Sequence, residues 1–227
     1  ETYVMLFKCK SWFWNMLVIM CYGLTNALVM TNISYYAAYI LGSSSKATPI
    51  LAVYLLVSIV VSFLTPKIDS LLGRRRAMFF AIFVQIVFKI PFIINPTSMA
   101  NILINAIATG TGTTIVFILF NTNRNNIADV VEIINHRRLD TMVSMGDTLA
   151  SKIADALLGL GMAAAMSAAG FDESLKFNQT LATKNTICAF LGWVPCIVLL
   201  FMWFFASRID VEKEKEEALK ARAAEII

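Results

Sequence analysis

Six long apolar segments constrain the fold of this chain more than any other feature of its sequence. They cover residues 11–41, 47–65, 77–94, 98–120, 141–169 and 184–206. Each is close to, or above, the roughly 20 residues that a tilted helix needs to cross a bilayer. Hydrophobic residues make up 58% of the chain, whereas a soluble domain is usually about 45–50% apolar. The sequence therefore predicts an all-α membrane protein with six transmembrane helices.

Basic residues outside these segments are divided unequally between the two sides of the predicted bundle. Alternate connections and the end of the chain carry Lys8, Lys10, Lys67, Arg74, Arg75, Arg76, Arg124, Arg137, Arg138, Arg208 and the lysines of the tail. The other connections carry only Lys46, Lys176 and Lys184. The positive-inside rule then predicts a multi-pass protein of the cell (plasma) membrane with both termini in the cytoplasm.

The same patterns divide the chain into two parts. Residues 1–210 form the predicted bundle, and residues 211–227 form a highly charged cytoplasmic tail that we expect to be helical or disordered. The chain begins at Glu1, without Met and without a signal-peptide pattern, so we expect an excerpt from a longer protein. The net charge of +4 is modest and reports orientation, not nucleic-acid binding.

Residue types that serve catalysis or metal binding are sparse. Three of the four cysteines lie in apolar segments, no Cys/His cluster exists, and the single histidine, His136, lacks local ligand partners. The sequence contains no Gly-rich phosphate loop, no HExxH and no GxSxG motif. We therefore expect no enzymatic activity, no metal site and no cofactor other than a coupling ion.

The fifth segment carries three ionisable residues at membrane depth. Lys152 lies near its middle, between Asp147 and Asp155. A helix places Asp147, Ser151 and Asp155 on one face, with Lys152 beside Asp155 and one turn after Thr148. Charges at this depth are costly and face partners or a water-filled cavity. These residues are candidates for binding a substrate or coupling ion, and an ion pair that locks two helices together is the alternative.

Two other segments carry polar stripes. In the fourth, Asn101, Asn105, Thr109 and Thr113 recur at steps of four, which suits either interhelical hydrogen bonding or the lining of a pore. In the first, Asn32 and Tyr36 share a face with Tyr39, and a tyrosine ring there could stack on a sugar. The alternative is an aromatic belt at the outer interface, which we favour for Tyr39. Lys89, near the outer end of the third segment, is expected to extend its amine to the interface.

Two cytoplasmic connections pair acidic with basic residues. Asp69 precedes Arg74 and Arg75, and a second stretch with Asp129 and Glu132 precedes Arg138. These charges suit both the positive-inside rule and a set of salt bridges that closes the cytoplasmic side in one transport state.

Several of these motifs resemble known transporters. Asp69 with Gly73-Arg74-Arg75 resembles the acidic-then-basic loop of the major facilitator superfamily, with one extra residue before the glycine. The stretch Ala128-Asp129-Val130-Val131-Glu132 resembles the A-D-x-V-D/E signature of the glycoside–pentoside–hexuronide:cation symporters, the melibiose permease family. Tyr35-Tyr36-x-x-Tyr39-x-Leu41-Gly42 resembles the end of that family's seventh helix, and Lys152 with Gly170-Phe171 resembles its eleventh.

The resemblance implies the C-terminal half of a twelve-helix carrier, built of two inverted three-helix repeats. Such a carrier moves a sugar or glycoside with Na⁺ or H⁺ by alternating access. The resemblance places Lys152 near the sugar and cation, Thr148 on the same lining, and Phe120 beside the sugar, where relatives often have Trp. The residues expected to face a cavity against the missing N-terminal half are Asn32, Tyr36, Asn105, Phe120, Thr148 and Lys152.

The partners implied are a small sugar, membrane lipid and that N-terminal half, with no nucleic acid. The alternative is a protein of another class, a six-span channel or membrane scaffold that oligomerises.

Overall fold

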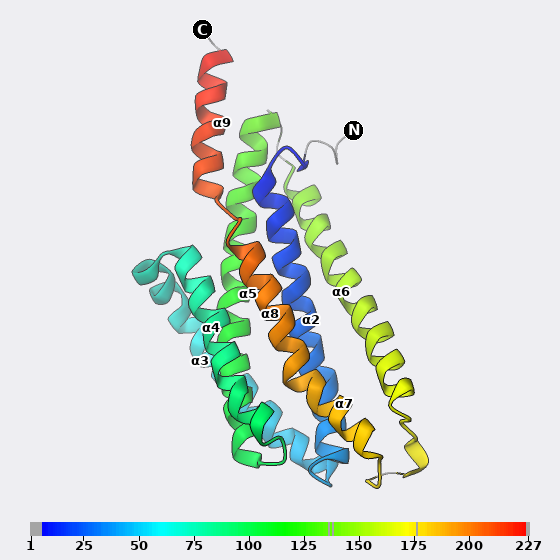
Figure 1. Cartoon of the computed structure of the whole chain (residues 1–227). Coiled ribbons are helices and arrows are strands. Elements are labelled where there is room, and N and C mark those ends of the chain that lie inside the picture. Colours follow the sequence, from blue (N-terminus) through cyan, green and yellow to red (C-terminus); the bar gives the residue numbers. More distant parts are fainter. Residues whose placement is uncertain (1–5, 136, 138, 176, 226–227) are drawn as a thin grey trace.

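The computed structural model describes residues 6–135, 137, 139–175 and 177–225, which form an elongated bundle of helices (Figure 1). The helices are α2 (Lys10–Tyr39), α3 (Ala47–Leu72), α4 (Arg74–Ile94), α5 (Met99–Asn135), α6 (Asp140–Ala168), α7 (Leu181–Leu191), α8 (Trp193–Ala206) and α9 (Val211–Glu225), with 3-10 turns at Ser44–Lys46 and Glu173–Leu175. Six helical stretches are long and apolar enough to cross a membrane, with residues 181–223 counted as one stretch. The predicted all-α, six-helix membrane fold is confirmed.

Several helix boundaries differ from those expected. Helix α3 continues through Pro66 to Leu72 and stops only at Gly73, whose φ of 77° lets the chain reverse directly into α4. Proline is tolerated inside membrane helices, so the end predicted at Pro66 was wrong. The last span is instead broken at Gly192, where a Cβ would lie 2.9 Å from the Ile93 side chain.

Helix α5 is longer than predicted and runs without interruption from Met99 to Asn135. The signature stretch 128–132 therefore lies on a helix and not in a loop, as the sequence had suggested. Its helical geometry places Asp129 and Glu132 one turn apart, near the cytoplasmic end expected from the basic residues.

The core lies between α2, α4, α5 and α8. Helix α5 packs on α3 and α4, while α2 packs on α6 and α8. Helix α6 buries only a narrow strip of side chains, which it turns toward α2: Val143, Gly146, Asp147, Ala150, Ala154, Met162 and Met166. Small residues allow this close approach, since a Cβ at Gly23 would lie 3.2 Å from that of Ala154.

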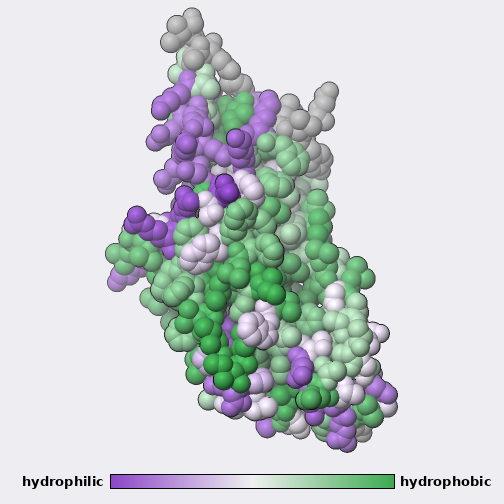
Figure 2. Space-filling view, in the orientation of Figure 1, coloured by the Kyte–Doolittle hydropathy of each residue, from purple (hydrophilic) through white to green (hydrophobic). Residues whose placement is uncertain are grey.

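The surface is divided by polarity along the long axis of the bundle. Apolar side chains cover most of the face in Figure 2, and hydrophilic ones gather over α9 and the neighbouring helix ends. The beginning of α2 lies at this same end, because the Ser11 N–H donates to the Glu214 carboxylate at 3.0 Å. An apolar band with a polar cap is the arrangement expected of a bilayer-embedded bundle.

Candidate functional site

Lys152 and Asp155 form an exposed ion pair on α6. Their charged atoms lie 3.6 Å apart, and the side chains are 75% and 55% exposed. The surrounding surface is apolar, with Leu149 and Ile153 also exposed. Thr148 lies on the same exposed surface one turn earlier, and its hydroxyl donates to the Ser144 carbonyl. A pair of opposite charges therefore stands on an otherwise apolar helix face.

Asp147 does not join this exposed pair. It belongs to the buried strip of α6 and lies 3.8 Å from the Arg124 guanidinium of α5. The sequence predicted one polar face for Asp147, Ser151 and Asp155, but the packing of α6 on α2 separates them. Asp147 points inward, while Asp155 points outward. The role of Arg124 as its partner was missed, because sequence spacing does not reveal contacts between helices.

Phe120 lies one turn before Arg124 on α5 and is buried in an aromatic cluster. Its ring centroid lies 5.2 Å from that of Tyr22 on α2 and 5.4 Å from that of Phe117. Nothing in the sequence pattern had singled out Tyr22. Phe120, Arg124 and Asp147 together connect α5 to α2 and α6.

Besides Phe120, three further residues expected to face a cavity lie inside the bundle instead. The Asn32 amide donates to the Ile187 carbonyl at 2.7 Å, and the Tyr36 hydroxyl donates to the Pro96 carbonyl. Asn105 accepts a hydrogen bond from Lys89. All three are buried, because their faces of α2 and α5 pack against neighbouring helices of the same chain. The expectation that they face a cavity is therefore corrected by the packing.

Lys89 is also placed differently from the prediction, since it does not extend to the interface. It is fully buried, and its amine donates to Asn105 Oδ1 at 2.8 Å and to Thr109 Oγ1 at 3.1 Å. The polar stripe of α5 thus supplies acceptors for a lysine of α4. This favours interhelical hydrogen bonding over pore lining for Asn105 and Thr109.

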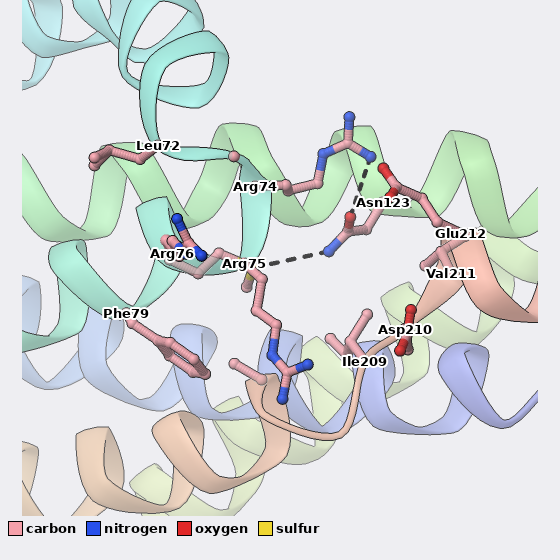
Figure 3. A pocket seen from close by; sticks show the side chains of 13 residues that line it. Leu72, Arg74, Arg75, Arg76, Phe79, Asn123, Ile209, Asp210, Val211 and Glu212 are labelled. Atoms are coloured by element: carbon pink, nitrogen blue, oxygen red, sulfur yellow. Dashed lines mark hydrogen bonds between the residues drawn. The ribbon is translucent and has the colours of Figure 1, made fainter.

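The connection between α3 and α4 forms a second polar cluster (Figure 3). Arg74 lies 3.8 Å from Asp69 and donates to Asn123 of α5 at 3.4 Å. Arg75 reaches toward α8 and donates to the Ser207 carbonyl at 2.6 Å. Arg74, Arg75 and Asn123 line a cavity of about 670 Å³ between α4, α5 and the α8–α9 connection. Asp69, Arg74 and Arg75 therefore connect α3, α4, α5 and the end of α8.

Helix α9 is held against the same end of the bundle. Lys215 lies 3.4 Å from Asp129 of α5, and Glu214 accepts hydrogen bonds from the Ser11 N–H and the Cys9 thiol. Burial, with the nearby Glu214 carboxylate, raises the pKa of Cys9 to about 12, so its thiol stays protonated as a donor. Glu132 lies one turn after Asp129, and Arg138 lies outside the described residues.

Comparison with known protein families agrees with this bundle of membrane helices. The family model described as MFS/sugar transport protein matches residues 5–213. The chain belongs to this family. A search of curated proteins finds no match. The family is one of transporters within the major facilitator superfamily, so the chain is a multi-pass membrane transporter of the sugar-transport class.

For a sugar transporter, the two charged sites differ in what they can do chemically. The Lys152 amine and the Asp155 carboxylate are open to a ligand, whereas Asp147 and Arg124 bridge two helices. No group of three metal-ligating side chains occurs among the described residues. The exposed pair on α6 can both donate hydrogen bonds to a polar molecule and accept them from it.

Proposed function

We propose that this chain is the C-terminal half of a glycoside–pentoside–hexuronide:cation symporter, which moves a sugar or glycoside with Na⁺ or H⁺ by alternating access. The observation that carries the proposal is the exposed Lys152–Asp155 pair on an apolar face of α6. Such a pair is costly against lipid tails. A second six-helix half facing α6 would enclose both charges in a water-filled cavity.

The two charges suit coupled transport. The Lys152 ammonium can donate to sugar hydroxyls, and the Asp155 carboxylate can accept from them or bind a cation. While the two side chains are paired, Lys152 takes the place of a cation beside Asp155. A Na⁺ or H⁺ that binds Asp155 releases Lys152 for the sugar, so each ligand favours binding of the other.

Cytoplasmic contacts supply a gate in this proposal. Asp69 with Arg74, and Asp129 with Lys215, join separate parts of the chain at one end. We assign Asp69, Arg74, Arg75, Asp129, Glu132 and Arg138 to a set that holds the cytoplasmic side closed in one state and separates in the other.

The proposed location is the plasma membrane, with both termini in the cytoplasm. The hydrogen bond between Ser11 and Glu214 supports a common side for the beginning of α2 and for α9. Basic residues gather at this end, as the positive-inside rule requires. The proposed partners are a small sugar, membrane lipid and the N-terminal six-helix half.

Transport by the intact carrier in proteoliposomes tests this function. The screen uses radiolabelled methyl glucoside, methyl galactoside, lactose and xylose, each with and without a Na⁺ gradient and a pH gradient. We expect accumulation of at least one sugar that depends on one of the two gradients. Equal sugar movement with and without both gradients, or no uptake of any panel member, contradicts the proposal.

A further inference from the structure

A groove between α2 and α6 begins beside the exposed ion pair. Its volume is about 620 Å³, and Asp155 lines it at the middle of α6. Phe171, just beyond the end of α6, lines its other end. The thirteen residues after Asp155, up to the end of α6 at Ala168, correspond to roughly 20 Å of helix at 1.5 Å per residue. The groove therefore leads from Asp155 to the end of the bundle opposite α9 (Figure 1).

Small side chains keep the groove open. Gly159 lies on its wall, and a Cβ added there would meet no atom within 4 Å. Gly161, two residues further along α6, also has open space around it, but it does not line the groove. The two glycines thus differ in the surface that they face and not in local crowding.

Aromatic rings form the end of the groove farthest from Asp155. The ring centroids of Tyr35 and Phe171 lie 6.0 Å apart at 76°, and Tyr39 packs on both rings. These mutual contacts fix the rings in place before any ligand arrives. A preorganised aromatic platform suits the C–H face of a pyranose, and the Tyr35 hydroxyl adds a polar handle.

Polar groups occur at both ends of the lining, which is mainly apolar between them. Thr31 of α2 and Ser167 of α6 bring hydroxyl groups, and Asp155 brings the one charged side chain of the lining. Hydroxyl and carboxylate groups suit a neutral ligand with many hydroxyls. A lipid acyl chain cannot form hydrogen bonds with these groups, although methionines also line the groove.

We propose that this groove is an outer binding site for a pyranoside, in which the sugar rests on the Tyr35–Phe171 platform before it moves along the groove to Asp155 and Lys152. The proposal rests on the sugar transport proposed above and adds a second position on the substrate's path. The continuity of the groove with the Lys152–Asp155 pair supports this order of binding.

Two matched tryptophan variants of the intact carrier test the groove. Gly159→Trp fills the groove, whereas Gly161→Trp adds the same side chain to the same helix outside it. With the best-transported sugar of the methyl glucoside, methyl galactoside, lactose and xylose panel, we expect Gly159→Trp to lower the initial uptake rate at least tenfold. Gly161→Trp should stay within twofold of the parent at equal amounts of folded carrier. Equal rates for the two variants overturn the proposal.

The platform itself is tested by the substrate dependence of uptake. Tyr35→Ala removes the ring and should raise KM about tenfold, because stacking contributes about 0.5–1.5 kcal/mol. Tyr35→Phe keeps the ring and should raise KM less than threefold. An unchanged KM for Tyr35→Ala contradicts a sugar-binding role for the ring.

Ser167→Cys distinguishes a sugar from a lipid in the groove. We expect the membrane-impermeant reagent MTSET to modify this cysteine and the transported sugar to slow the reaction at least threefold, with the parent carrier as the blank. No reaction, or a reaction that the sugar does not slow, supports a lipid-filled groove and overturns the proposal. If the parent takes up no panel sugar, both proposals fall. If it does but the variants behave like the parent, only the groove is excluded.

Discussion

Two lysines in membrane-spanning helices have opposite surroundings. Lys89 of α4 is fully buried, and its amine donates to Asn105 and Thr109 of α5. The Lys152 side chain of α6 is 75% exposed and lies beside Asp155. Lys89 makes no ion pair with any of the described residues, whereas Lys152 makes one that faces outward. The same residue type therefore joins helices at one position and remains open to a ligand at the other.

Glycines show the same contrast between the α4–α5 contact and the exposed face of α6. A Cβ at Gly112 of α5 would overlap the buried Gln85 side chain of α4, one turn from Lys89. A Cβ at Gly161 of α6 would meet nothing within 4 Å. The α4–α5 contact is thus close-packed around its polar groups, while most of α6 is left uncovered. The Lys89 charge is thus satisfied within the α4–α5 contact, whereas the Lys152–Asp155 pair is left exposed, as the proposed ligand site requires.

The largest expected effect follows from the close packing of α5. Gly112→Leu should destabilise the carrier by more than about 3 kcal/mol, because Gln85 and its helix must move to admit the side chain. Gly161→Leu, the control on α6, should change stability by less than about 1 kcal/mol. Thermal unfolding of the purified carriers in detergent compares them, and equal loss in both variants contradicts the contrast.

The Asp147–Arg124 pair is less buried than Lys89 and less exposed than Lys152. Breaking this pair should have the next largest effect on stability. Arg124→Ala leaves the buried Asp147 carboxylate unpaired and should lower the free energy of unfolding by about 2 kcal/mol. This loss is smaller than for a fully buried pair because the Arg124 side chain is 34% exposed. The Arg124→Ala/Asp147→Asn double variant should recover at least half of the loss. A double-mutant cycle without coupling argues against the pair.

Lys89→Met tests whether Lys89 contributes to the stability of the bundle alone or also to sugar transport. It removes two hydrogen bonds from a buried ammonium and should lower the free energy of unfolding by about 2 kcal/mol or less, because a buried charge is removed with them. Sugar uptake per folded molecule should remain within about twofold of the parent. A carrier that unfolds normally but no longer transports sugar would instead assign Lys89 to the transport pathway.

The smallest effect is expected at the end of the bundle that carries α9. Lys215→Gln breaks the 3.4 Å pair with Asp129, whose side chain is about half exposed, and should cost less than about 1 kcal/mol. If the pair belongs to the gate, the variant should still shift the ratio of inward to outward cysteine accessibility. If this ratio is unchanged in both transport directions, Lys215 is not part of the gate.

Much of the fold followed from the sequence because apolar length and the distribution of basic residues report membrane spans directly. The interruption at Gly192 and the passage of α3 through Pro66 did not, since neighbouring helices decide how a membrane helix tolerates these residues. The signature at 128–132 looked like a loop by its polarity, and its helical state depends on packing of α5 at the cytoplasmic end.

The candidate site was only partly accessible to sequence reasoning. The pairing of Lys152 with Asp155 was readable, because residues three apart on a helix are neighbours. The separation of Asp147 from that pair, its contact with Arg124 and the burial of Lys89 all depend on which helices meet. Tyr36 and Asn32 illustrate the same limit, since their hydrogen bonds connect to residues 60 and 155 positions away.

Sugar uptake and binding by Lys152→Ala in the intact carrier test the central claim most directly. Both are measured in proteoliposomes beside Lys89→Met, with equal amounts of folded protein. The account predicts that Lys152→Ala lowers gradient-driven uptake at least a hundredfold and weakens sugar binding at least tenfold, which corresponds to about 2.7 and 1.4 kcal/mol. It also predicts that Lys89→Met does neither. Intact uptake and intact binding in Lys152→Ala would contradict the account.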